Sequence, residues 1–520
     1  MEINIELIQE KLKKILDELN VGIYEKERSI RLTLLSVLAG ESIFLLGEPG
    51  TAKSLIARRI SEAFGIQKED FFCYLMNQFS QPDEVFGPVA ISKLKCDEYQ
   101  RKTEGYLPKA KFAFLDEIWK ANPAIQNALL TILNEREFRN NGKNEKVDLI
   151  GFVAASNELP AEDQGLDAIF DRFLVRILEQ PVSKDSDSFR DMISDSKELS
   201  PLTEKITLEE VKHIIKIAKT VKLSDECYDI IIRIAKVTSE QNEDNEDDKN
   251  DWFISDRRWK KIVNLMRVSA LCNGRYETDI MDATLIADCI WKNEKQEEDA
   301  KTIVKEAIEN YGLKCTINIE NLEKQVNKFK ETVDKKFFQQ EVIKETLKTT
   351  TINNIEFYIL EDSKKNIYKI SKDIQRRESY YNYDYYYYNG TSASDTIKGN
   401  YIQKNRFQRY DNNEIYTIVK TPEEIKIVMQ NFYKENPEEA KILIQQFNAN
   451  TYQPILNQLN NALSSINQEI EQGIKKYGNN VFSDNNFYFS AITTKLTDSK
   501  VEVNELIKQL KKQKDRYDIY

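Results

Sequence analysis

The stretch SIFLLGEPGTAKSLIARRI, residues 42–60, constrains the fold more than any other part of the chain. Its first residues are apolar and predict a short strand, its glycines favour a tight turn, and a helical pattern follows. A strand, a glycine-rich turn and a helix in this order are typical of a phosphate-binding loop, because the turn and the helix N-terminus present backbone N–H groups to an anion. The alternative is an ordinary strand–turn–helix unit without a ligand.

If the turn binds a nucleotide, its residues have predicted roles. Lys53 would reach the β- and γ-phosphates, and Ser54 would bind Mg²⁺ through its hydroxyl group. Ala52 stands where such loops usually have a final glycine, and alanine fits there if the position has a helical φ rather than a positive one. The predicted ATP-binding loop comprises Gly47, Glu48, Pro49, Gly50, Thr51, Ala52, Lys53 and Ser54.

Polar residues also follow two other predicted strands. The strand in AKFAFLDEIWKAN ends at Asp116 and Glu117, and two carboxylates at the end of a buried strand are costly unless they meet a cation or take part in a reaction. Asp116 would position Mg²⁺ through its water shell, and Glu117 would polarise an attacking water molecule. The alternative is a strand that simply ends in acidic turn residues. Asn157, after the strand in IGFVAASNELP, can orient the water by a hydrogen bond.

Arginines complete the candidate site. Arg172, in LDAIFDRFLVRILEQP, can project across a subunit boundary and neutralise charge on a transferred phosphoryl group. The alternative is a surface ion pair between Asp171 and Arg172. In ISDRRWKKI, Ser255 can cap a helix whose first turn carries Arg257 and Arg258. One of these two arginines can reach the nucleotide from a second domain and report its state.

Short apolar runs alternate with helical patterns up to about residue 182, which is typical of a parallel α/β layer. The nearly continuous apolar runs indicate strands that are covered on both faces. Later stripes of apolar residues predict long helices in a bundle or short coiled coil, and a β-containing region with the tyrosine-rich stretch 380–388 lies between them. One stripe is Leu322, Val326, Phe329 and Val333, and another is Leu459, Leu463, Ile466, Ile470 and Ile474. The predicted strands are Ser42–Leu46, Phe71–Leu75, Phe112–Leu115, Leu149–Ala154 and Phe173–Ile177.

Composition argues against several classes of protein. The net charge of −11 makes a protein that binds nucleic acid through its phosphates unexpected. Six cysteines without a C-x-x-C pair, and a single histidine, give no basis for a zinc site. No stretch approaches the ~20 apolar residues that span a bilayer, and the N-terminus has the pattern of a charged amphipathic helix rather than a signal peptide. We therefore expect a cytoplasmic protein that is not an integral membrane protein.

The order of these motifs resembles the AAA+ ATPases and, more narrowly, the MoxR family and its RavA branch. Strong resemblance covers about residues 20–275, and beyond about residue 300 it extends only to the architecture of helices with a small inserted β-module. The stretches that carry it are GESIFLLGEPGTAKSLIARRI, GYLPKAKFAFLDEIWKANPAIQNALLTILNEREFRN, VAASNELP and SDRRWKKI.

The resemblance implies a role for each site residue. Thr51 and Lys53 would belong to the Walker A motif with Ser54 on Mg²⁺, and Asp116 and Glu117 would form Walker B. The resemblance therefore implies an ATP hydrolase of the α/β class. Its expected parts are a P-loop core with a parallel sheet, an α-helical lid, and a C-terminal helical bundle with an inserted β-containing module.

The remaining residues take their roles from the same resemblance. Asn157 would be the sensor 1 residue, Arg172 the arginine finger and Arg257 the sensor 2 residue, with Arg258 as the adjacent alternative. The expected domains are the core at 1–190 with a helix-2 insert hairpin at about 86–107, the lid at 191–296, the bundle at 297–338 and 421–520, and the module at 339–420.

The family resemblance also implies partners. Its members form ATP-dependent hexamers with chaperone-like, remodelling roles, and RavA-like members act with a ViaA-like von Willebrand A-domain protein. A lysine decarboxylase partner depends on the inserted module, where this chain has no matching motif. Two other functions stay open at this point: a DNA-translocating motor, which would need a basic groove that the acidic chain does not display, and a slow nucleotide switch or scaffold, against which the intact pair Asp116 and Glu117 argues.

Overall fold

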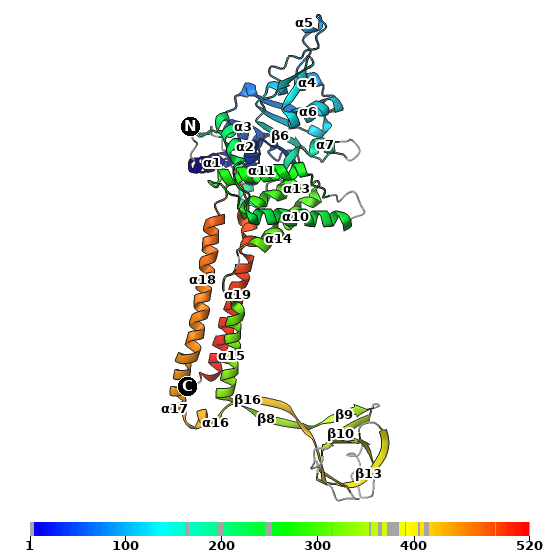
Figure 1. Cartoon of the computed structure of the whole chain (residues 1–520), viewed down its shortest axis with the longest axis vertical. Helices are drawn as coiled ribbons and strands as arrows, with labels where there is room; N and C mark the ends of the chain where they lie inside the picture. Colours follow the sequence, from blue (N-terminus) through cyan, green and yellow to red (C-terminus); the bar gives the residue numbers. More distant parts are fainter. Residues whose placement is uncertain are drawn as a thin grey trace. The chain divides into compact units, whose positions relative to one another are not determined.

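The structure is a computed structural model of the chain (Figure 1). By its internal contacts the chain divides into two units, Met1–Ile317 with Ser464–Val501, and Asn318–Leu463 with Glu502–Tyr520. The tyrosine-rich stretch lies partly outside the described residues, which resume at Asp384. The structure describes residues 5–161, 166–194, 199, 201–244, 252–313, 315–352, 355–361, 367–371, 384–389, 392–403, 406–409, 415–483 and 485–518.

The first unit contains a five-stranded sheet whose strands are all parallel, in the order β2-β3-β6-β1-β7. Every residue of β1 and β6 is buried, as their unbroken apolar sequences predict for strands that are covered on both faces. The predicted parallel α/β core is confirmed, although β6 begins at Gly151 rather than Leu149. The strands are β1 (Ser42–Gly47), β2 (Phe71–Leu75), β3 (Phe112–Asp116), β6 (Gly151–Ser156) and β7 (Phe173–Glu179).

Helices cover this sheet. α2 (Glu27–Ala39) packs on β1, β6 and β7, and α3 (Lys53–Ala63) packs on β3 and β6. Because the strands are parallel, their carboxyl ends share one edge of the sheet, which is where ligands bind in folds of this kind. The other core helices are α1 (Ile5–Asn20), α6 (Pro123–Glu135) and the single turn α7 (Asp167–Phe170) before β7.

The segment 86–107, predicted as an insert hairpin, projects from the core between β2 and β3. Its two sides are joined where the Ala90 N–H donates to the Gln100 carbonyl oxygen at 2.7 Å, and the short helix α5 (Ile91–Leu94) lies between them. In Figure 1, α5 lies at the tip of this projection. The neighbouring elements are α4 (Pro82–Phe86), the 3₁₀ turns η1 (Lys68–Asp70), η2 (Leu107–Lys109) and η3 (Ile118–Lys120), and the hairpin of β4 (Glu137–Asn140) and β5 (Lys143–Lys146).

Side chains cap the N-termini of several helices that follow the sheet. Thr207 accepts a hydrogen bond from the Glu210 N–H and so caps α9, and Ser255 caps α11 by accepting from the Arg258 N–H at 3.3 Å, as predicted. The helices are α8 (Asp187–Ser194), α9 (Leu208–Ala218), α10 (Asp225–Asp244), α11 (Asp256–Cys272), α12 (Ile280–Ala283), η6 (Thr284–Ile286), α13 (Ala287–Ile290) and α14 (Glu294–Tyr311).

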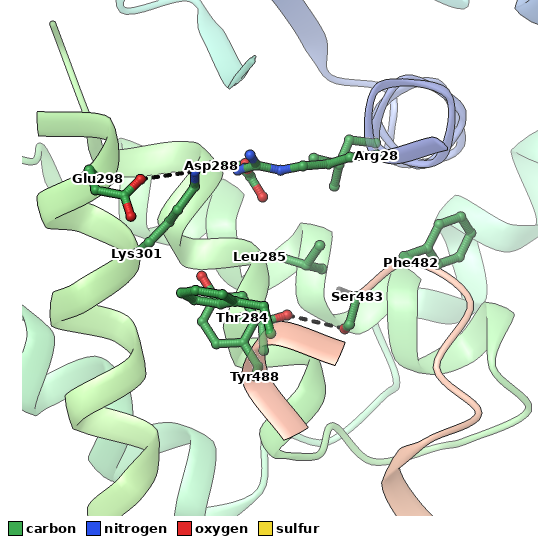
Figure 2. Close-up of a pocket in the computed structure, with 11 residues that line it drawn as sticks. Arg28, Thr284, Leu285, Asp288, Glu298, Lys301, Phe482, Ser483 and Tyr488 are labelled. Atoms are coloured by element: carbon green, nitrogen blue, oxygen red, sulfur yellow. Dashed lines mark hydrogen bonds and ion pairs between the residues drawn. The ribbon is translucent and has the colours of Figure 1, made fainter. Parts of the chain in front are cut away.

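Polar contacts fasten these helices to the core. Arg28 of α2 pairs with Asp288 of α13 and, at 3.1 Å, with Glu297 of α14. Figure 2 shows Arg28 reaching toward Asp288 beside a cavity of about 100 Å³. Thr284 of η6 and Ser483, from the segment before α19, lie in hydrogen-bond contact on the same cavity, with their Oγ atoms 3.1 Å apart. The core, the helices after it and the segment before α19 therefore meet around one cavity.

Long helices dominate the rest of the chain. The predicted stripe Leu322, Val326, Phe329 and Val333 is buried, and the Phe337 and Tyr517 rings stack with centroids 4.6 Å apart. No helix within the described ranges is long and apolar enough to cross a membrane. The helices are α15 (Ile319–Phe337), α16 (Asn431–Glu435), α17 (Pro437–Phe447), η8 (Asn448–Tyr452), α18 (Gln453–Tyr477) and α19 (Asn485–Tyr517).

A β-module interrupts the helices of the second unit, in the fold class that the sequence predicts. Seven strands form a sheet in the order β11-β12-β13-β14-β15-β10-β9, and β8 (Phe338–Leu347) pairs with β16 (Lys420–Met429) in a separate antiparallel ribbon. β16 occupies residues for which a helix was expected, because its alternation of charged and apolar residues has the period of a strand. The other strands are β9 (Thr349–Ile352), β10 (Ile355–Glu361), β11 (Ile367–Ser371), β12 (Asp384–Asn389), β13 (Ser392–Gln403), β14 (Arg406–Arg409) and β15 (Ile415–Ile418).

Candidate functional site

The loop between β1 and α3 turns sharply against β7. Gly47 pairs with Glu179, and a Cβ atom on Gly47 would lie 2.5 Å from the Glu179 carbonyl oxygen, so only glycine fits there. Gly50 has a φ of 86°, with open space where a Cβ atom would be. The Thr51 hydroxyl donates to the Glu48 carbonyl oxygen at 2.8 Å and closes the turn. The loop therefore has the compact form that a phosphate-binding loop needs.

Ala52 does not have the helical φ under which alanine suits the loop. Its φ is 66° and its ψ is 13°, in the left-handed region, which costs an L-residue about 1–2 kcal/mol. A positive φ at the N-cap of a helix helps successive backbone N–H groups converge on an anion, as in other phosphate sites. The strained alanine lies directly before Lys53, so strain is stored at the site itself.

The Lys53 side chain is buried within the loop. Its ammonium donates to the carbonyl oxygens of Gly47 at 2.6 Å and Glu48 at 2.9 Å, and to Oδ1 of Asn157 at 3.0 Å. Burial lowers the pKa of Lys53, and the neighbouring carboxylates oppose that effect. No side chain caps the N-terminus of α3, so the first N–H groups of this helix keep their capacity to bind an anion.

The two predicted carboxylates lie at the end of β3. Asp116 is its last residue, and burial raises the pKa of its carboxyl group. Glu117 has a φ of 52°, and its N–H donates to Oδ1 of Asp116 at 3.0 Å. The Glu117 carboxylate also pairs with Lys120 at 3.2 Å. A strained non-glycine residue at this point is typical of a functional site.

Asn157, the first residue after β6, joins the loop to the carboxylates. Its Oδ1 accepts from Lys53, and its Nδ2 donates to Oε1 of Glu117 at 2.5 Å. The Ser156 hydroxyl lies 3.5 Å from the other oxygen of Glu117. Lys53, Asn157 and Glu117 thus form one hydrogen-bonded chain across the edge of the sheet.

Mg²⁺ fits the oxygen donors beside this chain. Ser54, in the first turn of α3, has an exposed side chain, and Asp116 supplies a carboxylate. No group of three or more acidic, histidine or cysteine side chains with the geometry of a metal site occurs among the residues that the structure describes. Mg²⁺ commonly takes one or two protein oxygens and completes its shell with substrate phosphates and water, so Ser54 and Asp116 suit a metal that arrives with a nucleotide.

A cavity of about 500 Å³ opens beside the loop. Five of the eight predicted loop residues line it, Glu48 to Ala52. Its apolar lining comes from segments before α2 and after β7. No sequence motif connects these segments, so motif reasoning missed them. The volume of the cavity and its apolar lining suit a nucleobase. The residues are Ile23, Tyr24, Val182, Phe189 and Met192.

Arg172 and Arg257 lie near each other. Burial lowers the pKa of Arg172, and the positive charge of Arg257 lowers it further. Arg257 donates to Oδ1 of Asn134 at 2.7 Å. Arg172 contacts Asp171 at 3.5 Å, but its Nε has no partner among the described residues. Arg172 comes just before β7, whose first residue, Phe173, pairs with Ser42 at the start of β1, whereas Lys53 follows the other end of β1. Arg172 and Lys53 of the same chain therefore lie at opposite ends of these paired strands.

Arg258, the alternative to Arg257, faces the interior. It is 4% exposed, and all three of its nitrogens donate to acceptors of the protein itself. Nε donates to the Cys289 carbonyl oxygen at 2.5 Å, and Nη2 donates to the Leu174 carbonyl oxygen at 2.8 Å. No donor is left for a nucleotide. Of the pair, Arg257 is the residue whose side chain is available to a ligand.

Replacing Ala52 with glycine should stabilise the protein. Glycine adopts the observed φ without strain, and after its larger loss of backbone entropy on folding we expect a net gain of about 0.5–1 kcal/mol. The measurement is the thermal midpoint of the ligand-free protein, with Ala57→Gly inside α3 as the matched control that should lower it. A lower midpoint for Ala52→Gly would show that the loop does not hold this strain.

Two family models match the chain. Residues 10–218 match the "MoxR domain in the MoxR-vWA-beta-propeller ternary systems", and residues 226–304 match the AAA lid domain. Two uncharacterized proteins of Methanocaldococcus jannaschii are each 39% identical to the chain, over 55% of it and over 71% and 72% of their own lengths. A structural protein of Acidianus two-tailed virus is 31% identical over 41% of this chain and 36% of its own length.

The two family models together cover the loop, both carboxylates and the arginines. The first model contains the parallel sheet with Lys53, Glu117 and Asn157, and the second contains Arg257 and α13. The chain belongs to the MoxR family of AAA+ ATPases.

Proposed function

We propose that the protein hydrolyses ATP in a hexameric ring and uses the energy to remodel a protein partner in the cytoplasm, as a RavA-like member of its family. The observation that carries this proposal is the chain of hydrogen bonds from Lys53 through Asn157 to Glu117. It links the residue that would hold the γ-phosphate to the residue that would activate water. A protein that only binds nucleotide has no use for that link.

The residues divide the work of hydrolysis. The loop N–H groups and Lys53 hold the phosphates, while Asn157 fixes the Glu117 carboxylate so that it accepts a hydrogen bond from water in line with the γ-phosphate. Mg²⁺, held by Ser54 and Asp116, would neutralise charge on the β- and γ-phosphates. Catalysis of phosphoryl transfer rests mainly on such positioning and charge stabilisation.

The positions of Arg172 and Arg257 support an active site shared between subunits. Arg172 and Arg257 repel each other, and Arg172 lies at the opposite end of β1 and β7 from the loop of its own chain. A phosphate of ATP bound to a neighbouring subunit would relieve that repulsion and receive the charge stabilisation of an arginine finger. Each site of the ring would then be completed by the next subunit.

The matching model supports the choice of partner. It describes MoxR domains that occur with von Willebrand A-domain and β-propeller proteins, so we propose a ViaA-like von Willebrand A-domain protein as the partner. Nothing in the described β-module favours a lysine decarboxylase, and that partnership is not proposed.

Lys53→Ala should abolish ATP binding, because it removes the cation that faces the phosphates and the hydrogen bonds that hold the loop. Equilibrium binding of a fluorescent ATP analogue measures the loss. Lys205→Ala, at an exposed position of the first unit, is the control and should bind like wild type. Unchanged affinity in Lys53→Ala would remove the phosphate-loop assignment.

Glu117→Gln should bind ATP and assemble like wild type while turnover falls at least about 10²-fold, because the amide does not serve as a base. Steady-state release of phosphate, read beside ATP affinity and ring size, measures this. Turnover equal to wild type would place the base elsewhere, and turnover already absent in wild type would favour the nucleotide switch.

Arg172→Ala should bind ATP but lose about 10³-fold in turnover, the lower end of the known effect of an arginine finger. Mixed with Lys53→Ala, it should regain activity, since one subunit supplies the arginine and the other an intact loop. Wild-type turnover per subunit should rise with protein concentration and saturate. Mixed rings that form, as shown by sizing, yet stay inactive would contradict a finger in trans.

A further inference from the structure

We infer that Arg258, together with Arg176, is a positioning residue for Arg172: it ties the turn Phe170–Leu174 to α13, so that the finger offered to the next subunit follows the lid. The inference rests on the proposed role of Arg172. It concerns how that arginine is held, and neither Arg258 nor Arg176 touches the nucleotide.

Arg258 binds both sides of the turn that carries Arg172. Its Nη1 donates to the Asp171 carbonyl oxygen at 3.1 Å and to the Asp171 carboxylate at 3.3 Å. Its Nη2 donates to the carbonyl oxygens of Phe173 at 3.0 Å and Leu174 at 2.8 Å. These acceptors flank Arg172 in the sequence, and most are main-chain atoms. The backbone of the finger is therefore fixed by a guanidinium group from α11.

Arg176, in β7, holds the same turn from the strand side. It is 2% exposed, its Nη2 donates to the Phe170 carbonyl oxygen at 3.1 Å, and its guanidinium carbon lies 3.9 Å from the centre of the Phe170 ring. Its Nη1 donates to the Trp291 carbonyl oxygen. One buried cation thus contacts both the start of the turn and the residue after α13.

α13 is where these contacts meet. Arg258 reaches Cys289 and Arg176 reaches Trp291, while Arg28 of α2 pairs with Asp288, the residue before Cys289. The hydrogen bonds of a planar guanidinium depend on direction as well as distance. A rotation of α13 against β7 would misalign several of them together, and the turn would follow α13.

The Arg172 side chain has little to hold it by itself. Apart from Asp171 at 3.5 Å, no hydrogen bond or ion pair of its guanidinium is present among the described residues, and its Nε is buried without a partner. The direction of the Arg172 side chain therefore depends on the position of its own backbone. A displacement of about 1 Å at a reacting group costs about 10² in rate, so loss of the backbone anchor should be visible in turnover.

Arg258→Lys is the decisive variant. Lysine keeps the charge but cannot reach Cys289, Asp171 and Leu174 together, so turnover should fall about 10²-fold while ATP affinity and ring size stay at wild-type values. Arg275→Lys is the matched control: Arg275 is also a lid arginine, paired with Asp279 and Asp282 far along the chain from the turn. It should retain turnover within about threefold, the ordinary scatter of mutational effects.

Two readouts separate positioning from general damage. If Arg258 acts through Arg172, the double variant Arg258→Lys/Arg172→Ala should be no slower than Arg172→Ala alone. In rings mixed with Lys53→Ala, Arg258→Lys should regain activity as Arg172→Ala does, because its own loop is intact. Additive losses in the double variant, or no recovery in confirmed mixed rings, would overturn the inference. If Arg258→Lys folds poorly, Arg176→Lys answers the same two questions.

The two proposals fail differently. Full activity of Arg172→Ala would refute the arginine-finger role of Arg172, and with it the proposed shared site. Loss of activity in Arg172→Ala beside full activity in folded Arg258→Lys would leave the shared site intact and refute only the positioning role.

Discussion

Lys53, Glu117 and Asn157 meet because β6 lies between β1 and β3 in the sheet. Parallel strands end at a common edge, and the register places Leu46 opposite Ser156 and Leu115 opposite Ala154. The residues that follow the three strands therefore project from the same edge, and one amide side chain spans the distance between an ammonium and a carboxylate. A different strand order would add at least one spacing of about 4.8 Å to that distance. The chemistry of the site thus depends on the order of the strands.

The same rule explains what the sequence could predict. Lys53, Asp116, Glu117 and Asn157 each follow an apolar run, so the common edge of a parallel sheet brings them together without knowledge of the register. Properties that depend on contacts distant in the sequence could not be predicted. The positive φ of Ala52 follows from the closure of the loop, and the apolar cavity draws on segments on either side of the core. Ile474 belongs to a predicted apolar stripe yet is 50% exposed. Periodicity predicts which face of a helix is apolar, but it does not show along which part of its length another element covers that face.

Adjacent arginines illustrate the limit most clearly. Arg257 and Arg258 are alike in sequence, but a helix turns about 100° per residue, and that rotation points one side chain outward and the other into the interior. The inward arginine replaces water around its charge with main-chain carbonyl groups. A buried charge of this kind is costly to misplace, so it ties the parts that it contacts into one unit. α13 has only four residues, yet Arg28, Arg176 and Arg258 together hold it, and the residue after it, in place by such contacts.

The ribbon of β8 and β16 has a consequence for how such a chain can change. The polypeptide enters and leaves the seven-stranded sheet through paired residues, Leu347 opposite Lys420, whose Cα atoms in an antiparallel pair lie about 5 Å apart. Everything between them is an insertion with neighbouring ends, and the cost of closing such a loop rises only slowly with its length. The sheet can therefore be lengthened, exchanged or lost while the ribbon and the helices beneath it keep their packing. A lineage that inherits this arrangement can acquire new recognition surfaces without altering its α/β core.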